Sequence, residues 1–283
     1  MVPAGDRVTS AVTVVVATRD RRTELLGSLA HHPPPVIVVD NGSRDGTPEA
    51  VAAAFPDVEV LRLPGNRGAA ARNAGADRAR TRYLAFADDD SYWEGSSLAR
   101  AAAVLDAAPG TALLSARVLV GREGRLDPIS VEMARAPLGT PAGAPGPAIL
   151  GFLACAVVVR RDAFLAAGGF SPLLHVYGEE ALLAMDLAAA GWSLSYVEEL
   201  AVRHLPSTTA RNPAARRRRE ARNRVLTALL RRPMAHAGRT VWAELGDRDR
   251  RRGALGALAS LPAVLRDRTL LPPAVEADLR ALE

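Results

Sequence analysis

The segment YLAFADDD, residues 83–90, constrains the fold of this chain more than any other segment. Its first five residues are apolar and predict a short buried strand, which ends directly in Asp88, Asp89 and Asp90. Neighbouring carboxylates repel one another unless a cation shares them, and Mg²⁺ and Mn²⁺ prefer oxygen ligands. Ligands of open α/β sheets bind beyond the carboxyl ends of the strands, which favours a metal–phosphate site here. The alternative is a solvated acidic turn before a helix near Ser96.

Similar apolar runs precede this segment and alternate with helical patterns. The predicted strands are Val12–Thr18, Val36–Val39, Val58–Leu63 and Tyr83–Ala87. A short helix through about Ala30, another to about Phe55 and an Ala-rich helix after Gly68 separate them. The order βαβαβαβ predicts an α/β fold of the Rossmann type, a mostly parallel sheet with helices on both faces.

The second half of the chain is less regular. Its predicted elements are a helix at Ser97–Ala107, strands at Ala112–Val120 and Ala154–Val159, helices at Arg161–Ala167 and Ala181–Ala190, and short strands at Ser193–Val197 and Leu200–Val202. The stretch Gly121–Pro147 is rich in Gly, Pro and Ala and shows little periodicity. We interpret it as a substrate-facing loop rather than a linker, because compact segments flank it on both sides.

Composition excludes several classes of protein. Cys155 is the single cysteine, so intrachain disulfides and cysteine-based zinc sites are excluded, and a buried packing role is expected for it. The chain has no lysine, which removes the P-loop lysine and Schiff-base chemistry. No apolar run is long enough to span a bilayer and no signal pattern is present. We therefore expect a cytoplasmic protein, or one peripheral at the inner face of the membrane.

Positive charge is concentrated near the C-terminus. Residues 203–252 hold 15 Arg and 4 acids, a net charge of +11, whereas the whole chain carries +5. We predict a domain over residues 1–210 and a helical, Arg-rich appendage over 211–283, centred on Arg216–Arg219. Its arginines form either a solvated face or a surface for an anionic partner. A membrane surface is favoured over nucleic acid, because stacking aromatics are scarce there.

Six motifs in order resemble one family. They are VVDNGSRDGT (38–47), GNRGAAARNAG (65–75), LAFADDD (84–90), VVVRRDAFLAAGGF (157–170), GEEALLAMDLAAAGW (178–192) and VRH (202–204). Together they resemble the inverting glycosyltransferases of family 2, which have the GT-A fold. The resemblance covers roughly residues 10–206, with a nucleotide-binding half at about 10–120 and an acceptor half at about 121–206.

The resemblance implies a reaction. A member moves a sugar from a nucleotide-diphosphate donor to an acceptor hydroxyl and inverts the anomeric carbon by single displacement. It uses a divalent cation, Mg²⁺ or Mn²⁺, against the charge of the leaving diphosphate. The acceptor class stays open between a saccharide, a lipid-linked molecule and a natural product, and the tail could pair two subunits into a homodimer. The donor sugar and the base (uracil, guanine or thymine) also stay open.

The resemblance also implies site residues. Nucleotide and donor contacts fall on Thr18, Arg19, Asp40, Asn66, Arg67, Arg72, Asp88 and Asp89. In the DxD pattern Asp90 is the expected principal metal ligand, with Asp88 as a second ligand. His204 would reach the diphosphate or the metal. From the residues alone, Asp40 could instead cap the turn that follows it.

The expected catalytic base is Glu180, with Glu179 as a second candidate. Both lie at the predicted start of a helix, where the helix dipole would lower the pKa of a carboxylate. The family often has a third acid two positions later, and Leu182 stands there. An ordinary acidic helix N-terminus is the alternative. Trp93, His175 and Tyr177 are assigned to the acceptor site from their positions alone.

Three other classes of protein share some of these features. Sugar-nucleotide pyrophosphorylases rely on an early glycine-rich loop and an essential lysine, and this chain has neither. A non-catalytic nucleotide-sugar-binding protein on the same fold would keep Asp40 and lose the acids, which are all present. A protein that binds an anionic surface or nucleic acid through the Arg-rich appendage remains a further alternative.

Overall fold

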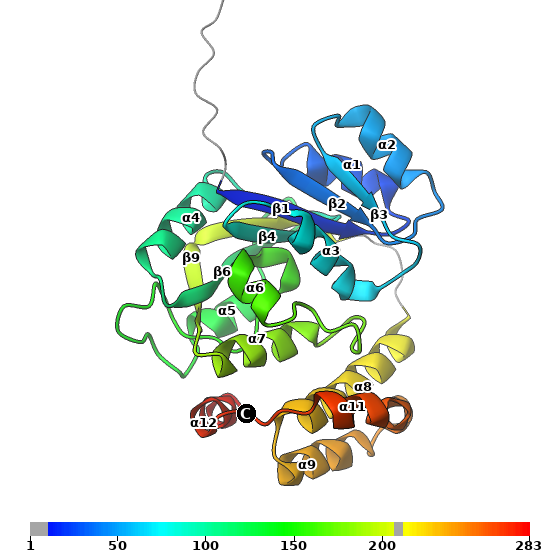
Figure 1. The fold of residues 1–283 in the computed structure, drawn as a ribbon, viewed down its shortest axis with the longest axis vertical. Coiled ribbons are helices and arrows are strands. Elements are labelled where there is room, and N and C mark those ends of the chain that lie inside the picture. Colours follow the sequence, from blue (N-terminus) through cyan, green and yellow to red (C-terminus); the bar gives the residue numbers. More distant parts are fainter. Residues whose placement is uncertain (1–10, 207–211) are drawn as a thin grey trace, which may run out of the picture.

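A central layer of parallel strands forms the first half of the sheet. The structure is a computed structural model that describes residues 11–206 and 212–283. Its first four strands are β1 (Val12–Thr18), β2 (Val36–Asp40), β3 (Glu59–Arg62) and β4 (Tyr83–Asp88). β1 pairs in parallel with both β2 and β4, so the carboxyl ends of three strands meet at one edge. Figure 1 shows this layer with α1, α2 and α3 around it.

Helices cover both faces of that layer. They are α1 (Arg22–Leu29), α2 (Thr47–Ala54), the short helix η1 (Gly68–Ala70) and α3 (Ala71–Arg78). Val14 and Val16 of β1 pack into one core, while Val15 points into the other. Side chains alternate along a strand, so a continuous apolar run is needed to fill two cores. The parallel α/β prediction is therefore confirmed for this half.

Beyond β4 the sheet is mixed. The second half contains β5 (Ser91–Trp93), α4 (Ser97–Ala107), β6 (Thr111–Val120), β7 (Arg125–Leu126), α5 (Pro128–Ala134), η2 (Ala154–Ala156), β8 (Val157–Arg160), α6 (Arg161–Ala166), α7 (Glu179–Ala189) and β9 (Ser193–His204). The strand order is β3-β2-β1-β4-β8-β6-β9-β5, with β7 on β6. β8 lies antiparallel between β4 and β6, whereas β9 is parallel to β6. The sheet is thus parallel throughout β1–β4 and mixes parallel and antiparallel pairs beyond them.

Several predicted boundaries were wrong. The two short strands expected near Ser193 and Leu200 form one strand, β9, because a register shift near Val197 keeps the chain paired with β6. The excursion 121–147 contains β7 and α5, and the Asp127 side chain caps α5 by accepting from Ile129 N. Helix α7 begins at Glu179 rather than Ala181.

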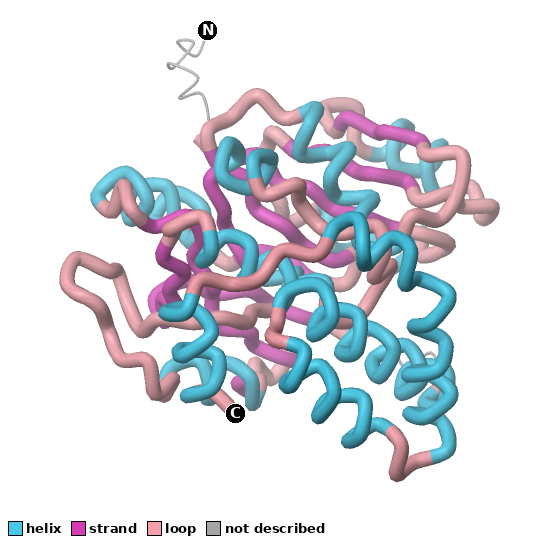
Figure 2. The backbone as a smooth tube through the Cα atoms, turned by 60° about the horizontal axis from the view of Figure 1, so that its bottom comes forward, coloured by secondary structure: helices cyan, strands magenta, loops and turns pink. Residues whose placement is uncertain are grey.

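The C-terminal part is a helical bundle. It consists of α8 (Pro213–Arg231), α9 (Met234–Glu244), α10 (Arg248–Gly256), η3 (Ala257–Ser260), α11 (Leu261–Asp267) and α12 (Pro273–Ala281). In Figure 1 these helices lie below α7, and Figure 2 brings them forward. Asn212 caps α8 by accepting from Ala214 N and Ala215 N. The predicted boundary between residues 210 and 211 lies outside the described residues.

The bundle shares its cores with the α/β part. Leu174 and Leu182 pack with Val225 and Leu226 of α8. Met185 of α7 packs with Leu271, Val275 and Leu279 around α12. The predicted appendage therefore packs onto α7, whose second residue, Glu180, is the expected catalytic base. In the described part of the chain, no helix is long and apolar enough to cross a membrane.

Most arginines of the predicted basic centre are engaged in ion pairs. Arg217 and Arg218 both contact Asp249 of α10, at 2.9 and 2.7 Å. Arg224 and Arg250 both contact Glu244, at 2.7 Å each. These pairs tie α8 to α9 and α10. Of the two interpretations of the Arg-rich segment, the solvated arginine face fits these side chains better than a surface for an anionic partner.

Candidate active site

The three acids lie at the carboxyl edge of the parallel layer. Asp88 is the last residue of β4, and Asp89 and Asp90 form the turn into β5. β1 and β4 run parallel, and Ala17 of β1 lies opposite Asp88 of β4. The next residue of β1 is Thr18, which therefore reaches this turn. Its Oγ1 donates a hydrogen bond of 3.0 Å to Asp89 Oδ2. Thr18, which was predicted to contact the nucleotide-sugar donor, thus orients the carboxylate of Asp89.

Arg21 compensates two of the acids and was missed by sequence reasoning. Its Nε lies 2.6 Å from Asp89 Oδ1, and its Nη2 lies 2.7 Å from Asp90 Oδ2. The signal available was the polar turn Arg19–Arg22 after the first strand, but nothing local told which arginine turns inward. The chain itself therefore supplies part of the positive charge that we had expected from a metal.

Asp89 is a buried acid whose pKa is raised by its surroundings. Burial raises its pKa to about 7, and the charges of Asp88 and Asp90 act in the same direction. Arg21 and the Thr18 hydroxyl oppose this shift. Asp89 therefore titrates near neutral pH, unlike an exposed aspartate.

His204 and Asp90 meet across two strands. β5 pairs antiparallel with β9, which sets Ser91 opposite His204. His204 Nε2 lies 3.3 Å from Asp90 Oδ1, and Leu205 N donates to the Asp90 carbonyl at 2.8 Å. A carboxylate oxygen and an imidazole nitrogen side by side suit Mn²⁺ as a pair of ligands, whereas Mg²⁺ prefers oxygen ligands and would be held by Asp90.

A cation here would need ligands beyond the protein. Among residues 11–206 and 212–283, no group of three or more His, Cys, Asp or Glu side chains is arranged to hold a metal ion. Asp88, the third expected acid, pairs with Arg72 instead, and its side chain is 39% exposed. Such partial donor sets are usual where substrate phosphates and water complete the coordination. The residues present fit a cation held jointly with a diphosphate.

Arg72 connects the acids to the start of α7. It projects from α3, is 8% exposed, and forms a hydrogen bond and ion pair with Asp88. Arg72 and Asp88 are also among the charges that act on Glu180. Cys155 lies near the same charges, and burial raises the pKa of its thiol. Its predicted role as a buried packing residue is confirmed.

Burial sets the protonation of the two glutamates. Glu179 is 3% exposed, and burial together with the charge of Glu180 raises its pKa to about 8. Burial also raises the pKa of Glu180, while Arg72 opposes the shift. The prediction that the helix N-terminus lowers these pKa values was wrong, because desolvation outweighs the dipole here.

A cleft beside the acids collects three of the predicted nucleotide residues. Arg19, Asp40 and Asn66 line a hollow of about 490 Å³ at the carboxyl ends of β1 and β2. Asp40 is 3% exposed and accepts from Ser43 N at 3.2 and 3.3 Å. Its alternative role, capping the following turn, is therefore realised in the structure.

Asn41 ties the segment after Asn66 to the end of β2 and was not foreseen. Its Oδ1 accepts from Arg67 N at 2.7 Å, and its Nδ2 donates to Gly68 O at 3.0 Å. Asn66 accepts from Gly68 N at 2.8 Å, which closes a tight turn. The main chain of the predicted Asn66–Arg67 segment is thus fixed against the end of β2.

The loop before the glutamates has an unusual backbone. His175 and Tyr177 have φ values of +64° and +73°, a region that non-glycine residues rarely occupy. The His175 carbonyl accepts from Ala69 N at 2.6 Å. Gly68 makes this approach feasible, because a Cβ at that position would lie 2.1 Å from His175 O. The predicted acceptor residue His175 therefore packs against Gly68 and Ala69, next to the predicted nucleotide residues Asn66 and Arg67.

Helix α8 supports this loop from the other side. Asn223 Nδ2 donates to the carbonyls of Leu174, Val176 and Tyr177 at 2.7, 2.9 and 2.7 Å, and Asn223 is 1% exposed. Arg216 lies over the Tyr177 ring, 5.1 Å from its centroid. A residue of the predicted appendage thus fixes the backbone just before Glu179. No local signal in the sequence marked Asn223.

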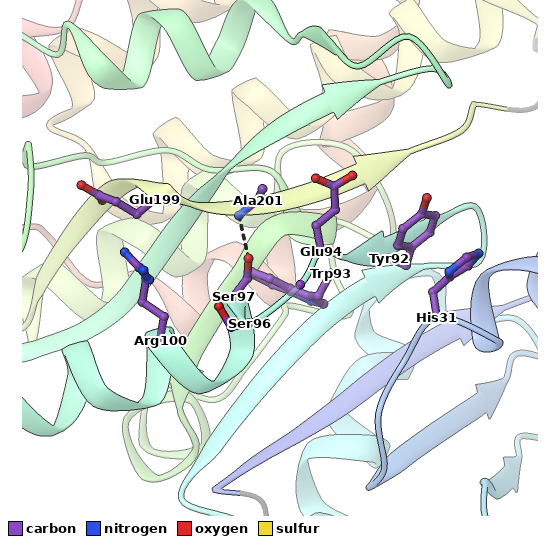
Figure 3. A pocket seen from close by; sticks show the side chains of 10 residues that line it. His31, Tyr92, Trp93, Glu94, Ser96, Ser97, Arg100, Glu199 and Ala201 are labelled. Atoms are coloured by element: carbon purple, nitrogen blue, oxygen red, sulfur yellow. Dashed lines mark hydrogen bonds between the residues drawn. The ribbon is translucent and has the colours of Figure 1, made fainter.

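Trp93 was wrongly assigned to the acceptor site. It is 3% exposed and packs in the sheet core, and its Nε1 donates to Phe86 O at 3.2 Å. Figure 3 shows the hollow of about 610 Å³ above it, where His31 and Tyr92 stack with centroids 4.1 Å apart. None of the six predicted acidic site residues lines this hollow.

Known structures define the class of protein. The chain superimposes on the mannosyltransferase PcManGT from Pyrobaculum calidifontis, in complex with GDP-Man and Mn²⁺, with a TM-score of 0.59 and 21% identity over 96% of this chain and 85% of that one. It superimposes on S. aureus TarS 1-349 in complex with UDP-GlcNAc with a TM-score of 0.61 and 21% identity over 94% and 83%. The fold is that of the GT-A glycosyltransferases.

Family comparison then identifies the chain. The model described as glycosyl transferase family 2 matches residues 13–166, more than half of the 283 residues. The chain therefore belongs to glycosyltransferase family 2, and it is a glycosyltransferase. A model of glycosyl transferase family 21 matches residues 94–239, which include the start of the helical bundle.

Two curated relatives extend the comparison. The N-acetylglucosaminyl-diphospho-decaprenol L-rhamnosyltransferase of Mycobacterium tuberculosis is 28% identical over 259 residues, 74% of this chain and 80% of that protein. The succinoglycan biosynthesis protein ExoO of Rhizobium meliloti is 40% identical over 93 residues. That second match spans 32% of this chain and 26% of ExoO.

Proposed function

We propose that this glycosyltransferase moves a sugar from a nucleoside diphosphate donor to an acceptor hydroxyl, with inversion at the anomeric carbon in one displacement. The observation that carries the proposal is the meeting of a cleft, three acids and two glutamates at one edge of the sheet. The cleft is lined by Arg19, Asp40 and Asn66, and the acids follow β4. The structural neighbours bound to GDP-Man and UDP-GlcNAc support this donor class.

Glu180 is the proposed general base. It removes the proton of the acceptor hydroxyl as that oxygen attacks the sugar. Burial raises its pKa, which makes its carboxylate a better proton acceptor than an exposed glutamate. Glu179, with a pKa of about 8, is protonated at neutral pH. A protonated Glu179 places no second negative charge beside the Glu180 carboxylate that would act as the base.

The second requirement is to stabilise the negative charge that develops on the leaving diphosphate. Arg67 and Arg72 flank the expected path of the phosphates, and guanidinium groups bind phosphate oxygens in bidentate geometry. A bound Mg²⁺ or Mn²⁺ would add Lewis-acid stabilisation, with Asp90 and His204 as protein ligands and Asp88 at its edge. Arg21 holds Asp90 so that one of its oxygens stays directed at His204. The Mn²⁺ in neighbouring structures supports the metal.

We favour a lipid-linked saccharide as acceptor over a free saccharide or a natural product. The name of the mycobacterial relative, which acts on a diphospho-decaprenol, supports this choice. An apolar groove of about 660 Å³ lies between α5 and residues 149–152, and its walls include Ile129, Met133, Ile149 and Phe152. A groove of this lining suits a hydrocarbon chain.

Calorimetry and turnover together test the proposal. UDP, GDP and dTDP are titrated with and without Mn²⁺ into the wild type, Asp90→Asn and Glu180→Gln. One nucleotide should bind with a metal dependence that Asp90→Asn removes. Glu180→Gln should keep that binding and lose transfer by about 10²-fold or more. Glu198→Gln, on an exposed bend of β9, is the matched control and should behave as wild type.

Other results would reject specific parts of the proposal. If no nucleoside diphosphate binds, the donor site is wrong. If the wild type binds a donor without transferring its sugar to any acceptor class, the chain is a non-catalytic binding protein on this fold. If Glu180→Gln keeps full transfer, Glu179→Gln becomes the variant that must abolish it.

A further inference from the structure

The outer side of the helical bundle is unusually apolar. Ten large hydrophobic side chains are exposed in the described part of the chain, and seven of them lie in the bundle: Met234, Trp242, Leu255, Leu258, Leu265, Leu270 and Leu282. Trp242 is 78% exposed and Leu265 is 76% exposed. Single exposed apolar residues are ordinary on a protein surface, but several on adjoining helices indicate an interaction site.

The leucines form one stripe. α10, η3 and α11 follow one another without interruption from Arg248 to Asp267. Ala254, Ala257 and Val264 face inward and pack on α8. Leu255, Leu258 and Leu265 each come directly after one of these inward residues, so they lie about 100° around the helix axis from the inward side, on exposed surface. The apolar surface of this helical segment therefore extends from its inward side onto the adjoining exposed side.

Helix α9 adds a second exposed apolar side. Ala237 and Glu244 are its buried residues, so its inner side faces the bundle. Met234 is 62% exposed, and Trp242 follows two turns later. Arg239 is an exposed charged residue between them. We call the exposed side chains of residues 234–267 the outer face.

Unpaired positive charge also lies beside this outer face. The side chains of Arg239, Arg248, Arg251 and Arg252 have no ion-pair partner among the residues that the structure describes, and all four are exposed. Arg216, Arg217 and Arg218 on α8 are paired with acids instead. In the stretch 216–219, first suspected of binding an anion, three of the four arginines are thus ion-paired and Arg219 is exposed without an ion-pair partner in the described part of the chain, whereas the exposed arginines of α10 lie beside the leucine stripe.

We propose that the outer face of α9–α11 binds the surface of an anionic lipid bilayer. Leucine side chains would enter the boundary between head groups and acyl chains, where tryptophan is also favoured. Unpaired arginines next to them would contact anionic head groups. A second copy of this chain fits less well, because both copies would bring the same unpaired arginines together.

The inference goes beyond the transferase chemistry and does not depend on the donor. Helix α8 lies between the outer face and the loop that precedes Glu179, with Asn223 contacting the loop and Val225 packing in the bundle core. A bilayer bound on the outer face would therefore lie on the side of the molecule that supports the glutamates. That position suits an acceptor drawn from the membrane.

Vesicle binding by the full chain tests the proposal. The protein is sedimented with vesicles of phosphatidylcholine, with and without phosphatidylglycerol, and its tryptophan emission is followed. Trp93 is 3% exposed and Trp192 is half-buried, so a blue shift on binding reports Trp242, and Trp242→Phe should remove it. We expect binding only with phosphatidylglycerol. Replacing Leu255, Leu258 and Leu265 by serine together should weaken it at least about ten-fold.

Charge-matched variants separate free from paired arginines. Arg251→Gln with Arg252→Gln should weaken vesicle binding about ten-fold and reduce its salt dependence. Arg217→Gln with Arg218→Gln removes the same charge from ion-paired positions and should change binding less than about two-fold. Circular dichroism checks that each variant is folded.

Three outcomes would overturn the proposal. Equal binding to both kinds of vesicle, or equal losses from the two arginine pairs, would remove the role of the outer face. No vesicle binding by the wild type would also remove it. Concentration-dependent dimerisation that the serine variant abolishes, without vesicle binding, would assign the face to a second copy. None of these results affects donor binding, so failure here is distinct from failure of the proposed transferase reaction.

Discussion

Replacing Asn223 by alanine should release the loop in front of the glutamates. The amide of Asn223 has two N–H donors for the carbonyls of Leu174, Val176 and Tyr177, and the residue is 1% exposed. Water cannot readily replace these bonds at so buried a position. The substitution therefore removes the donors and leaves buried carbonyls without partners.

The magnitude follows from the contacts. Two lost donors cost about 1–3 kcal/mol in net hydrogen bonding, and each buried carbonyl left unpaired costs about 1–3 kcal/mol. His175 and Tyr177 both have positive φ values, which costs about 1–3 kcal/mol of strain each. The hydrogen bonds from Asn223 hold the loop in this strained conformation. We expect the loop to open about 3 kcal/mol more easily, which is a change of roughly 100-fold in the opening equilibrium.

Hydrogen exchange measures this change without a known substrate. Peptides covering residues 171–178 should exchange about 100-fold faster in Asn223→Ala. The amide of Ala69 should also lose protection, because it donates to the His175 carbonyl. Sugar transfer should decrease because the loop in front of Glu179 and Glu180 opens. Nucleotide binding in the cleft lined by Arg19 and Asp40 should persist.

A matched control lies on the same helix. Asn212→Ala removes the cap of α8, which costs about 1 kcal/mol, but Asn212 does not contact the loop. Its exchange in residues 171–178 should equal that of the wild type. Unchanged exchange in Asn223→Ala, or the same increase in Asn212→Ala, would refute the positioning role of Asn223.

Three further substitutions or conditions have defined outcomes. Gly68→Ala puts a Cβ 2.1 Å from the backbone of His175 at a φ of +62°, so urea unfolding should report a loss of about 3 kcal/mol or more. Arg21→Gln removes a charge that lowers the pKa of Asp89, so that pKa should rise above about 7 in carboxyl-resolved NMR. The pKa of Glu244 is lowered to about 2, from an ordinary 4.5, so its stabilisation is complete above pH 4.5 and is lost as the pH falls toward 2. Because its arginine partners are half exposed, about 1–2 kcal/mol should disappear over that range in unfolding titrations.

Each of these has its own control. Gly65→Ala, where no atom lies within 4 Å of the added Cβ, should change stability by less than about 1 kcal/mol. Arg22→Gln, one residue from Arg21, should leave the pKa of Asp89 unchanged. Glu244→Gln should flatten the pH dependence of stability between pH 4.5 and 2, and a slope equal to that of the wild type would contradict the assignment.

Local sequence patterns determined the parallel half of the fold and the position of the acids. Continuous β-branched runs such as Val12–Thr18 fill two cores, so they were recognisable as strands buried on both faces. Parallel pairing then puts the end of each such strand at one edge. That is why Thr18, Asp40 and Asp88, each at or next to a strand end, could be grouped from the sequence alone.

Tertiary structure decided which side chains act on those acids. Arg21 contacts acids 68 and 69 positions away, and Asn223 contacts a loop 46–49 positions away. Strand β9 brings His204 to Asp90 only because it crosses to the far side of β6 and pairs with β5. Trp93 turned into the core, and burial raised the pKa values of Glu179 and Glu180. Strand and helix periodicity is written in neighbouring residues, whereas ion pairs, burial and pKa depend on which distant segments pack together.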